Sequence, residues 1–109
     1  MVIEFEKMEE KELPNFKNGE KQYNVRMFTE GDNKIMQGRL VPGASIGLHT
    51  HMTDCEVIFI TSGSGKVSDD GEEREVCEGM ALFCPKGHSH TLINDSEKDL
   101  CFYAAVIAQ

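Results

Sequence analysis

Short apolar runs, separated at regular intervals by turn residues, constrain the fold of this 109-residue chain more than any other feature. Turn chemistry recurs roughly every 10–15 residues, for example at Asn18-Gly19 and Asp70-Gly71. Asn-Gly and Asp-Gly supply the positive backbone φ angles that tight hairpins require. The spacing therefore predicts an all-β sandwich or barrel.

The strands that we expect cover residues 22–29, 33–41, 45–51, 55–62, 64–68, 73–77, 80–84, 89–94 and 99–107. This number of strands suffices for a jelly roll that closes on itself and leaves few exposed edges. Residues 1–20 are expected to be a solvated, partly ordered N-terminal segment, in which 6–13 makes at most a helical turn or two. The sequence shows no linker or low-complexity tract, so we expect one domain over 1–109.

Charge and hydropathy exclude several classes of partner. The net charge is −8, whereas phosphate binding needs clustered Lys and Arg, so nucleic acid and anionic membranes are not expected to bind. No apolar run approaches the ~18 residues of a membrane helix. Residues 1–16 carry acids where a signal peptide would need basic residues. We expect a soluble, cytoplasmic protein whose cysteines are reduced, buried and inert thiols: Cys55, Cys77, Cys84 and Cys101.

The four histidines of the chain fall into two close pairs, His49 with His51 and His88 with His90. Because side chains alternate along a strand, His49 and His51 face the same side. A short turn then brings Glu56 back beside them, which gives three ligands of a first-row metal site. His90 is the candidate for a fourth ligand from a neighbouring strand. Spacing alone leaves a metal site and a partly exposed, unliganded pair equally open.

Two stretches carry a resemblance to a known family. Residues 43–63, GASIGLHTHMTDCEVIFITSG, match the motif G-x5-H-x-H-x4-E-x6-G at every specified position. Residues 79–94, GMALFCPKGHSHTLIN, match G-x5-P-x-G-x2-H-x3-N in the same way. The chain resembles the cupin superfamily, in particular the small stand-alone bacterial cupins. The resemblance implies a double-stranded β-helix jelly-roll barrel.

The resemblance also implies roles for individual residues. Four side chains would hold one divalent transition metal (Fe, Mn, Ni, Co, Cu or Zn): His49, His51, Glu56 and His90. Ligand type alone does not choose among these metals. Other motif positions would shape turns and strand ends: Gly43, Gly63, Gly79, Pro85, Gly87 and Asn94. His88 stands at an unspecified position, where it is either an exposed turn residue or a proton shuttle beside the metal.

A metal with four protein ligands has up to two open positions, and three functions follow from that. One is a dioxygenase-like enzyme acting on a small organic molecule in the barrel cavity. Another is a non-redox isomerase or decarboxylase that uses the metal as a Lewis acid. The third is a non-catalytic module that binds or senses a small molecule. The sequence offers no evident acid or base partner for catalysis.

The cavity around the metal is expected to be mostly apolar, with a lining that we predict to include Ile58, Ile60, Leu92, Met36 and Leu40. Only two residues on the predicted strands are plausible anchors for an anion, Arg26 and Arg39. Alternation turns Arg39 outward if Leu40 faces inward.

A homodimer is expected from the resemblance, built from the outer faces of the sheets. The N-terminal segment, residues 1–20, is expected to be either partly ordered or involved in dimer contacts, through exchange of the N-terminal strands between the copies. Three apolar residues outside the motifs are candidates for that interface, with core packing as the competing explanation for each: Phe5, Phe16 and Phe28.

Overall fold

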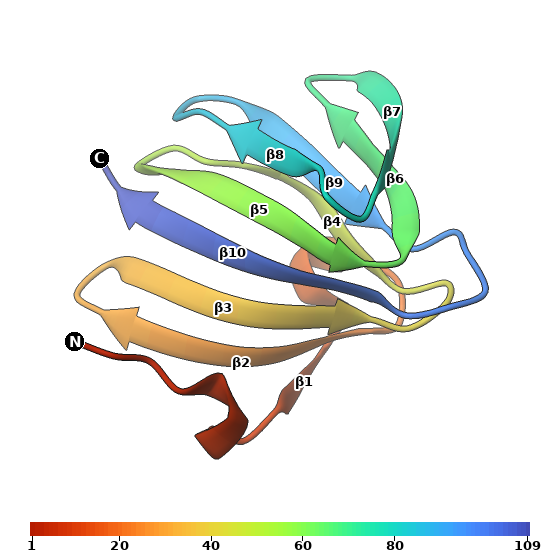
Figure 1. The fold of residues 1–109 in the computed structure, drawn as a ribbon. Helices are drawn as coiled ribbons and strands as arrows, with labels where there is room; N and C mark the ends of the chain where they lie inside the picture. The colour runs from red at the N-terminus through yellow and green to blue at the C-terminus, as the bar shows by residue number, and fades with distance from the viewer.

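The structure, a computed structural model, describes residues 1–109 as two antiparallel sheets that face each other (Figure 1). Six strands form one sheet in the order β1-β2-β3-β10-β5-β8, and four form the other in the order β4-β9-β6-β7. The strands are β1 (Lys11–Pro14), β2 (Gln22–Glu30), β3 (Asn33–Leu40), β4 (Ser45–Thr50), β5 (Asp54–Ser62), β6 (Ser64–Asp69), β7 (Glu72–Cys77), β8 (Ala81–Cys84), β9 (Ser89–Ile93) and β10 (Leu100–Ala108). The prediction of an all-β jelly roll is confirmed.

The nine predicted strands correspond to β2 through β10, and every boundary agrees to within one residue. The N-terminal segment differs from the prediction. Its helical content is limited to the 3-10 turns η1 (Phe5–Lys7) and η2 (Phe16–Asn18), and β1 pairs with β2. Pairing with a distant strand overrides the local preference of a charged segment. No helix in the structure has the length and apolar character to cross a membrane.

The core lies between the two sheets, and alternation along the strands supplies it. On β5, Ile58 and Ile60 are buried while Phe59 between them is exposed, as the sequence predicts. The rings of Tyr23 and Phe102 stack with their centroids 5.8 Å apart. A Cβ atom at Gly38 would collide with both rings, which explains a glycine in the middle of β3.

The turns between strands gather at two ends of the molecule. The site end, on the left in Figure 1, holds the β2–β3, β4–β5 and β8–β9 turns and the C-terminus. The closed end holds the β3–β4 and β9–β10 connections. There the fully buried Asn94 donates hydrogen bonds to the carbonyl oxygens of Leu40 and Lys98, both at 2.7 Å. These bonds tie the connections together at the closed end.

The cysteines fit their prediction only in part. All four are free thiols, but Cys84 alone is buried. Cys77 is exposed on β7, an edge strand, while Cys55 and Cys101 are half-buried on the outward face of the six-stranded sheet. Sequence reasoning assigned them all to the core because free cysteine packs as a small apolar residue. Alternation along β5 separately predicted that Cys55 faces away from Glu56, and its position on the outward face confirms this.

Candidate metal centre

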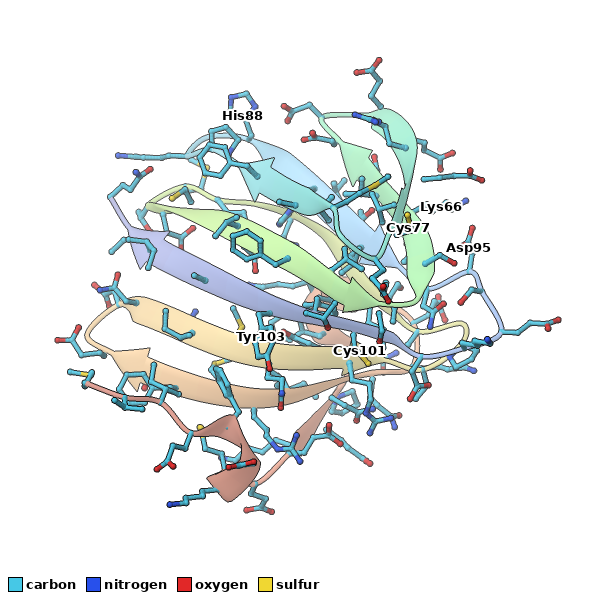
Figure 2. All side chains as sticks on the ribbon, viewed as in Figure 1. Lys66, Cys77, His88, Asp95, Cys101 and Tyr103 are labelled. Carbon is cyan, nitrogen blue, oxygen red and sulfur yellow. The ribbon has the colours of Figure 1, made fainter.

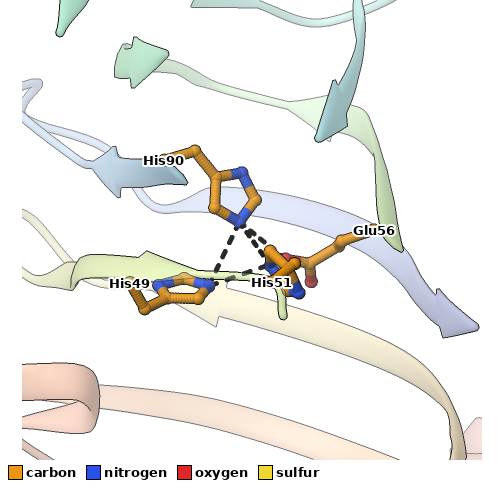
Figure 3. Close-up of side chains that lie close together, drawn as sticks. All are labelled: His49, His51, Glu56 and His90. Atoms are coloured by element: carbon orange, nitrogen blue, oxygen red, sulfur yellow. Dashed lines mark hydrogen bonds and ion pairs between the residues drawn. The ribbon is translucent and has the colours of Figure 1, made fainter. Parts of the chain in front are cut away.

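Four side chains from both sheets converge near the site end (Figure 3). His49 on β4 lies directly opposite His90 on β9, and His51 follows at the end of β4. Glu56 reaches them from β5 in the facing sheet. The structure therefore brings together the four residues that the sequence singled out: His49, His51, Glu56 and His90.

Their ligand atoms all lie within 4.8 Å of one another. The Nε2 atom of His90 is 2.9 Å from that of His51 and 3.1 Å from that of His49. The Oε1 atom of Glu56 is 2.9 Å from His90 Nε2, 3.2 Å from His51 Nε2 and 4.0 Å from His49 Nε2. Two ligands at right angles on a metal with bonds of 2.0–2.1 Å are about 3 Å apart. The spacing thus suits one small cation.

Hydrogen bonds on the far sides of two imidazoles fix their orientation. The Nδ1–H group of His49 donates to the carbonyl oxygen of Gly47 at 2.8 Å, and that of His51 donates to the Asp54 carboxylate at 2.5 Å. A proton on Nδ1 leaves the Nε2 lone pair of each ring pointing at the cluster, as metal ligation requires. Sequence analysis missed Asp54, although alternation along β5 places it on the same face as Glu56.

The electrostatics of the cluster favour a cation. Burial alone would raise the pKa of Glu56, but hydrogen bonds from His51 and His90 outweigh it and lower that pKa to about 2. The hydrogen bond to Glu56 raises the pKa of His51, whereas burial lowers the pKa of His49. A buried carboxylate needs a positive partner. Three imidazoles and one carboxylate fit a first-row divalent metal, and a proton on His51 would compete with it.

His88 lies apart from the cluster, at the surface (Figure 2). Its side chain is 49% exposed, and its Nδ1 atom is hydrogen-bonded to the carboxylate of Asp70 on the β6–β7 turn. Only its backbone approaches the site, where its carbonyl oxygen accepts a hydrogen bond from the amide of His51. This placement is that of a turn residue.

Cys84 is a buried thiol on the strand next to Glu56. It lies opposite Glu56 in the β5–β8 pair and is 1% exposed. Burial raises the pKa of its thiol to about 11, so the thiolate that a metal needs is disfavoured.

A cavity of about 500 Å³ opens beside the cluster, and His49, His51 and Glu56 form part of its lining. The predicted lining is wrong in most positions. Met36 lines the cavity, but the other predicted residues pack in the core instead: Ile58, Ile60, Leu92 and Leu40. The remaining wall comes from β1, η2, β2, β3, β4, the β4–β5 turn and β10. Sequence reasoning missed the part formed by β1 and η2 because the ordered N-terminal segment was not predicted.

The predicted anion anchors lie outside this cavity. Arg39 faces outward, as predicted, and its guanidinium donates to the carboxylates of Glu10 and Asp99. Arg26, beside it on the same face, donates to the carbonyl oxygen of Met8 and to Gln37. The cations that do line the cavity are Lys17 and Lys34.

Comparison with known proteins agrees with this architecture. The family model of the cupin domain matches residues 36–106, which include all four side chains of the cluster. The chain belongs to the cupin family. As a cupin, it is 36% identical over 69 residues to an oxalate-binding protein from Thermotoga maritima. That match covers 63% of this chain and 57% of the relative, so it spans little more than half of the relative's length.

Solved structures show the same cupin fold. A predicted oxalate decarboxylase from Thermotoga maritima superposes with a TM-score of 0.93 at 25% identity, over 100% of both chains. A sugar phosphate isomerase of the cupin superfamily from Silicibacter pomeroyi gives a TM-score of 0.80 at 19% identity, over 100% of this chain and 76% of the other. The second likeness concerns the fold alone. The double-stranded β-helix predicted from the two motifs is confirmed.

Proposed function

We propose that this cupin holds one divalent transition metal and uses it to bind a small chelating carboxylate, with oxalate as the first ligand to test. The observation that carries the proposal is the convergence of four ligand atoms within 4.8 Å at the wall of a cavity. The metal ligands are His49, His51, Glu56 and His90. The relative at 36% identity, an oxalate-binding protein, supports the choice of ligand.

The chain's own residues prepare the site for such a ligand. Gly47 and Asp54 hold the rings of His49 and His51 with their Nε2 atoms directed at the metal. Four protein ligands leave up to two positions on an octahedral ion, which matches the two carboxylates of oxalate. When bound, the metal supplies a positive centre that attracts carboxylate oxygens.

Binding is better supported than catalysis. An oxygenase, isomerase or decarboxylase needs a group that moves a proton near the bound molecule. The two carboxylates at the site, Glu56 and Asp54, are both engaged with histidines. Burial, together with the charge of Glu56, raises the pKa of Tyr23 and keeps its hydroxyl protonated. Its proton is donated to the sulfur of Met36 at 3.6 Å. None of these groups is free to act as a base.

Decarboxylation of oxalate is the second candidate, since the structural neighbour at 25% identity is a predicted oxalate decarboxylase. Incubation of metal-loaded protein with carbon-13-labelled oxalate distinguishes the two. The binding proposal expects the oxalate signal to persist in the NMR spectrum. A growing formate signal would show decarboxylation and would reject the proposal of binding alone. Consumption of dissolved oxygen would favour an oxidative reaction.

The ligand assignment is tested with two histidine variants of one motif. His90→Ala removes a proposed ligand, while His88→Ala removes an exposed histidine two residues away. Elemental analysis after saturation with metal and desalting should give one equivalent in the parent and in His88→Ala. It should give less than a tenth of that in His90→Ala. Full occupancy in a folded His90→Ala would refute the assignment.

Calorimetry tests the ligand class. Oxalate should bind the metal-loaded parent and should not bind protein treated with a chelator and desalted. Equal binding to both forms would place oxalate away from the metal. Absence of binding to the loaded form would reject the proposal.

We also propose that the protein is a homodimer, formed through the outer face of the six-stranded sheet. Side chains of β5, β8 and β10 expose an apolar surface there: Phe59, Phe83, Tyr103 and Ile107, with the half-buried Val57 on the same face. None of these is charged, so two copies of a chain with net charge −8 would meet there without like charges in contact. Light scattering should give twice the chain mass, and Phe59→Asp should give a monomer. A monomeric parent would rule out the dimer.

Two of the predicted interface residues have ring partners within the chain. Phe5 packs on the ring of Tyr103, with centroids 5.7 Å apart, and Phe16 packs on Tyr23 at 5.3 Å. The exposed face of β5, β8 and β10 is the stronger basis for an interface.

A further inference from the structure

The cavity beside the cluster is much larger than oxalate. Its volume is about 500 Å³. Oxalate has two carbons and four oxygens, and at the ~30 Å³ that a water molecule takes in the liquid these atoms need at most about 180 Å³. The remaining space holds roughly ten further non-hydrogen atoms.

Half of the residues that line the cavity are apolar, and several elements contribute them: Leu13, Phe16, Met27, Met36, Ile46 and Val106. A ligand made only of carboxylates would leave this concave surface facing water, at a cost of about 25 cal/mol per Å² of apolar area. Apolar clefts with a few polar groups at one position are the usual form of a small-molecule site. The two methionines allow the wall to adapt to an irregular ligand.

The wall depends on a close backbone approach. The 3-10 turn η2 lies against β4, and a Cβ atom at Gly47 would collide with the backbone of Lys17 and Gly19. Glycine at this position therefore lets η2 pack close enough to place the Phe16 ring on Tyr23 and beside the cavity. The same Gly47 accepts the hydrogen bond of His49. One residue thus supports both the apolar wall and the metal cluster.

The cavity also carries positive charge. Lys34 lies on the inward side of β3, directly opposite the buried Val106 and two residues before Met36. Lys17 lines the cavity from η2. Asp54 and Glu56 line the cavity as well, but both are engaged with histidines of the cluster. The two exposed lysines are therefore the charges open to a ligand, and they favour an anionic one.

We propose that the preferred ligand is a chelating acid with an apolar body of several carbons, such as a medium-chain α-keto acid, rather than oxalate. The acid group would bind at the metal, and the body would lie against the apolar wall. This inference rests on the proposed function, because it takes the metal as the point of attachment.

The test is a ligand series measured by calorimetry on the metal-loaded protein: oxalate, pyruvate, α-ketobutyrate, α-ketovalerate and α-ketocaproate. Each added methylene should increase affinity about three- to four-fold until the cavity is filled. A flat series with measurable oxalate binding would overturn the inference and leave the proposed function standing. If no member binds, both fail.

A variant that fills the cavity tests where the apolar body of the ligand binds. Met27 is half-buried on β2 and lines the cavity, so Met27→Trp should remove most of the gain for α-ketocaproate and leave oxalate affinity within two-fold. Val2→Trp, on an exposed residue outside this cavity, is the control and should leave the whole series unchanged. A long-chain gain that survives in Met27→Trp would show that the ligand does not use this wall.

Discussion

The two ends of the sandwich bury their residues to a similar degree but bury different chemistry. At the closed end Leu40, Leu100 and Phe102 are no more than 1% exposed. Near the site end His51 and Glu56 are 7% and 8% exposed. Buried apolar groups stabilise the fold directly, whereas a buried carboxylate is costly without a partner. We infer that the closed end provides most of the stability of the fold. The stability of the site end depends on the metal that its four side chains would bind.

The largest expected effect comes from a substitution in the core at the closed end. Phe102→Ala should lower the free energy of unfolding by about 3–5 kcal/mol, because it leaves a cavity beside Tyr23. Urea denaturation measures the loss. Phe102→Leu keeps most of the volume and should show a smaller loss of the same sign, with one equivalent of metal still bound. A folded Phe102→Leu protein that no longer binds metal would show that the two ends are not independent.

Metal removal tests whether the stability of the site end depends on the bound metal. A metal at 100 times its dissociation constant should raise the free energy of unfolding by about 2.7 kcal/mol, because it binds only the folded state. Thermal unfolding with metal and with excess chelator measures the difference. In His90→Ala the two curves should coincide. The same difference in the parent and the variant would mean that metal stabilises the protein elsewhere.

Asp54→Asn sharpens the comparison within the site end, because it removes the carboxylate that accepts the His51 proton without removing a ligand. Partners of this kind typically affect metal affinity 10- to 100-fold. We expect a loss in that range by competition with a chelating dye. Asp95→Asn, on an exposed aspartate of the β9–β10 connection, should change nothing. Unchanged affinity in Asp54→Asn would argue against ligation through His51 Nε2.

The smallest effect concerns an ion pair on the outer surface, at neither end. A hydrogen bond from Arg39 lowers the pKa of Glu10 below its usual value of 4.5. Since the folded-state pKa is the lower one, the pair stabilises the fold above pH 4.5, and this contribution is lost as the pH falls through the folded-state value. Both side chains are partly exposed, so Glu10→Gln should cost at most about 1 kcal/mol at pH 7.

The control for the Glu10–Arg39 pair is the dependence of the free energy of unfolding on pH. The free energies of unfolding of Glu10→Gln and the parent, measured by urea denaturation, should converge as the pH falls below 4.5 and through the folded-state pKa of Glu10. A difference between them that stays constant with pH would assign the effect to packing rather than charge.

Local patterns were sufficient for most of the fold. Turn chemistry and alternation give nine strands and place Ile58 and Ile60 inside, because both signals depend only on neighbours in sequence. The spacing of His49 and His51, together with the motif resemblance, is enough to predict that four side chains from different strands form one site.

The cavity could not be predicted in the same way. Its wall depends on the pairing of β1 with β2 and on the approach of η2 to Gly47, and both are contacts between distant segments. The segment that forms them is highly charged, which made solvation the natural expectation. Leu13 and Phe16 were the available signals, two apolar residues of this charged segment that pack against the core.

The most direct test of the central claim is X-ray absorption of the zinc-loaded protein. We predict scattering from three imidazoles and one carboxylate oxygen at about 2.0–2.2 Å. A sulfur contribution at about 2.3 Å would instead indicate Cys84, the buried thiol opposite Glu56. Fewer than three imidazoles would equally contradict the assignment of His49, His51, Glu56 and His90 as the four ligands.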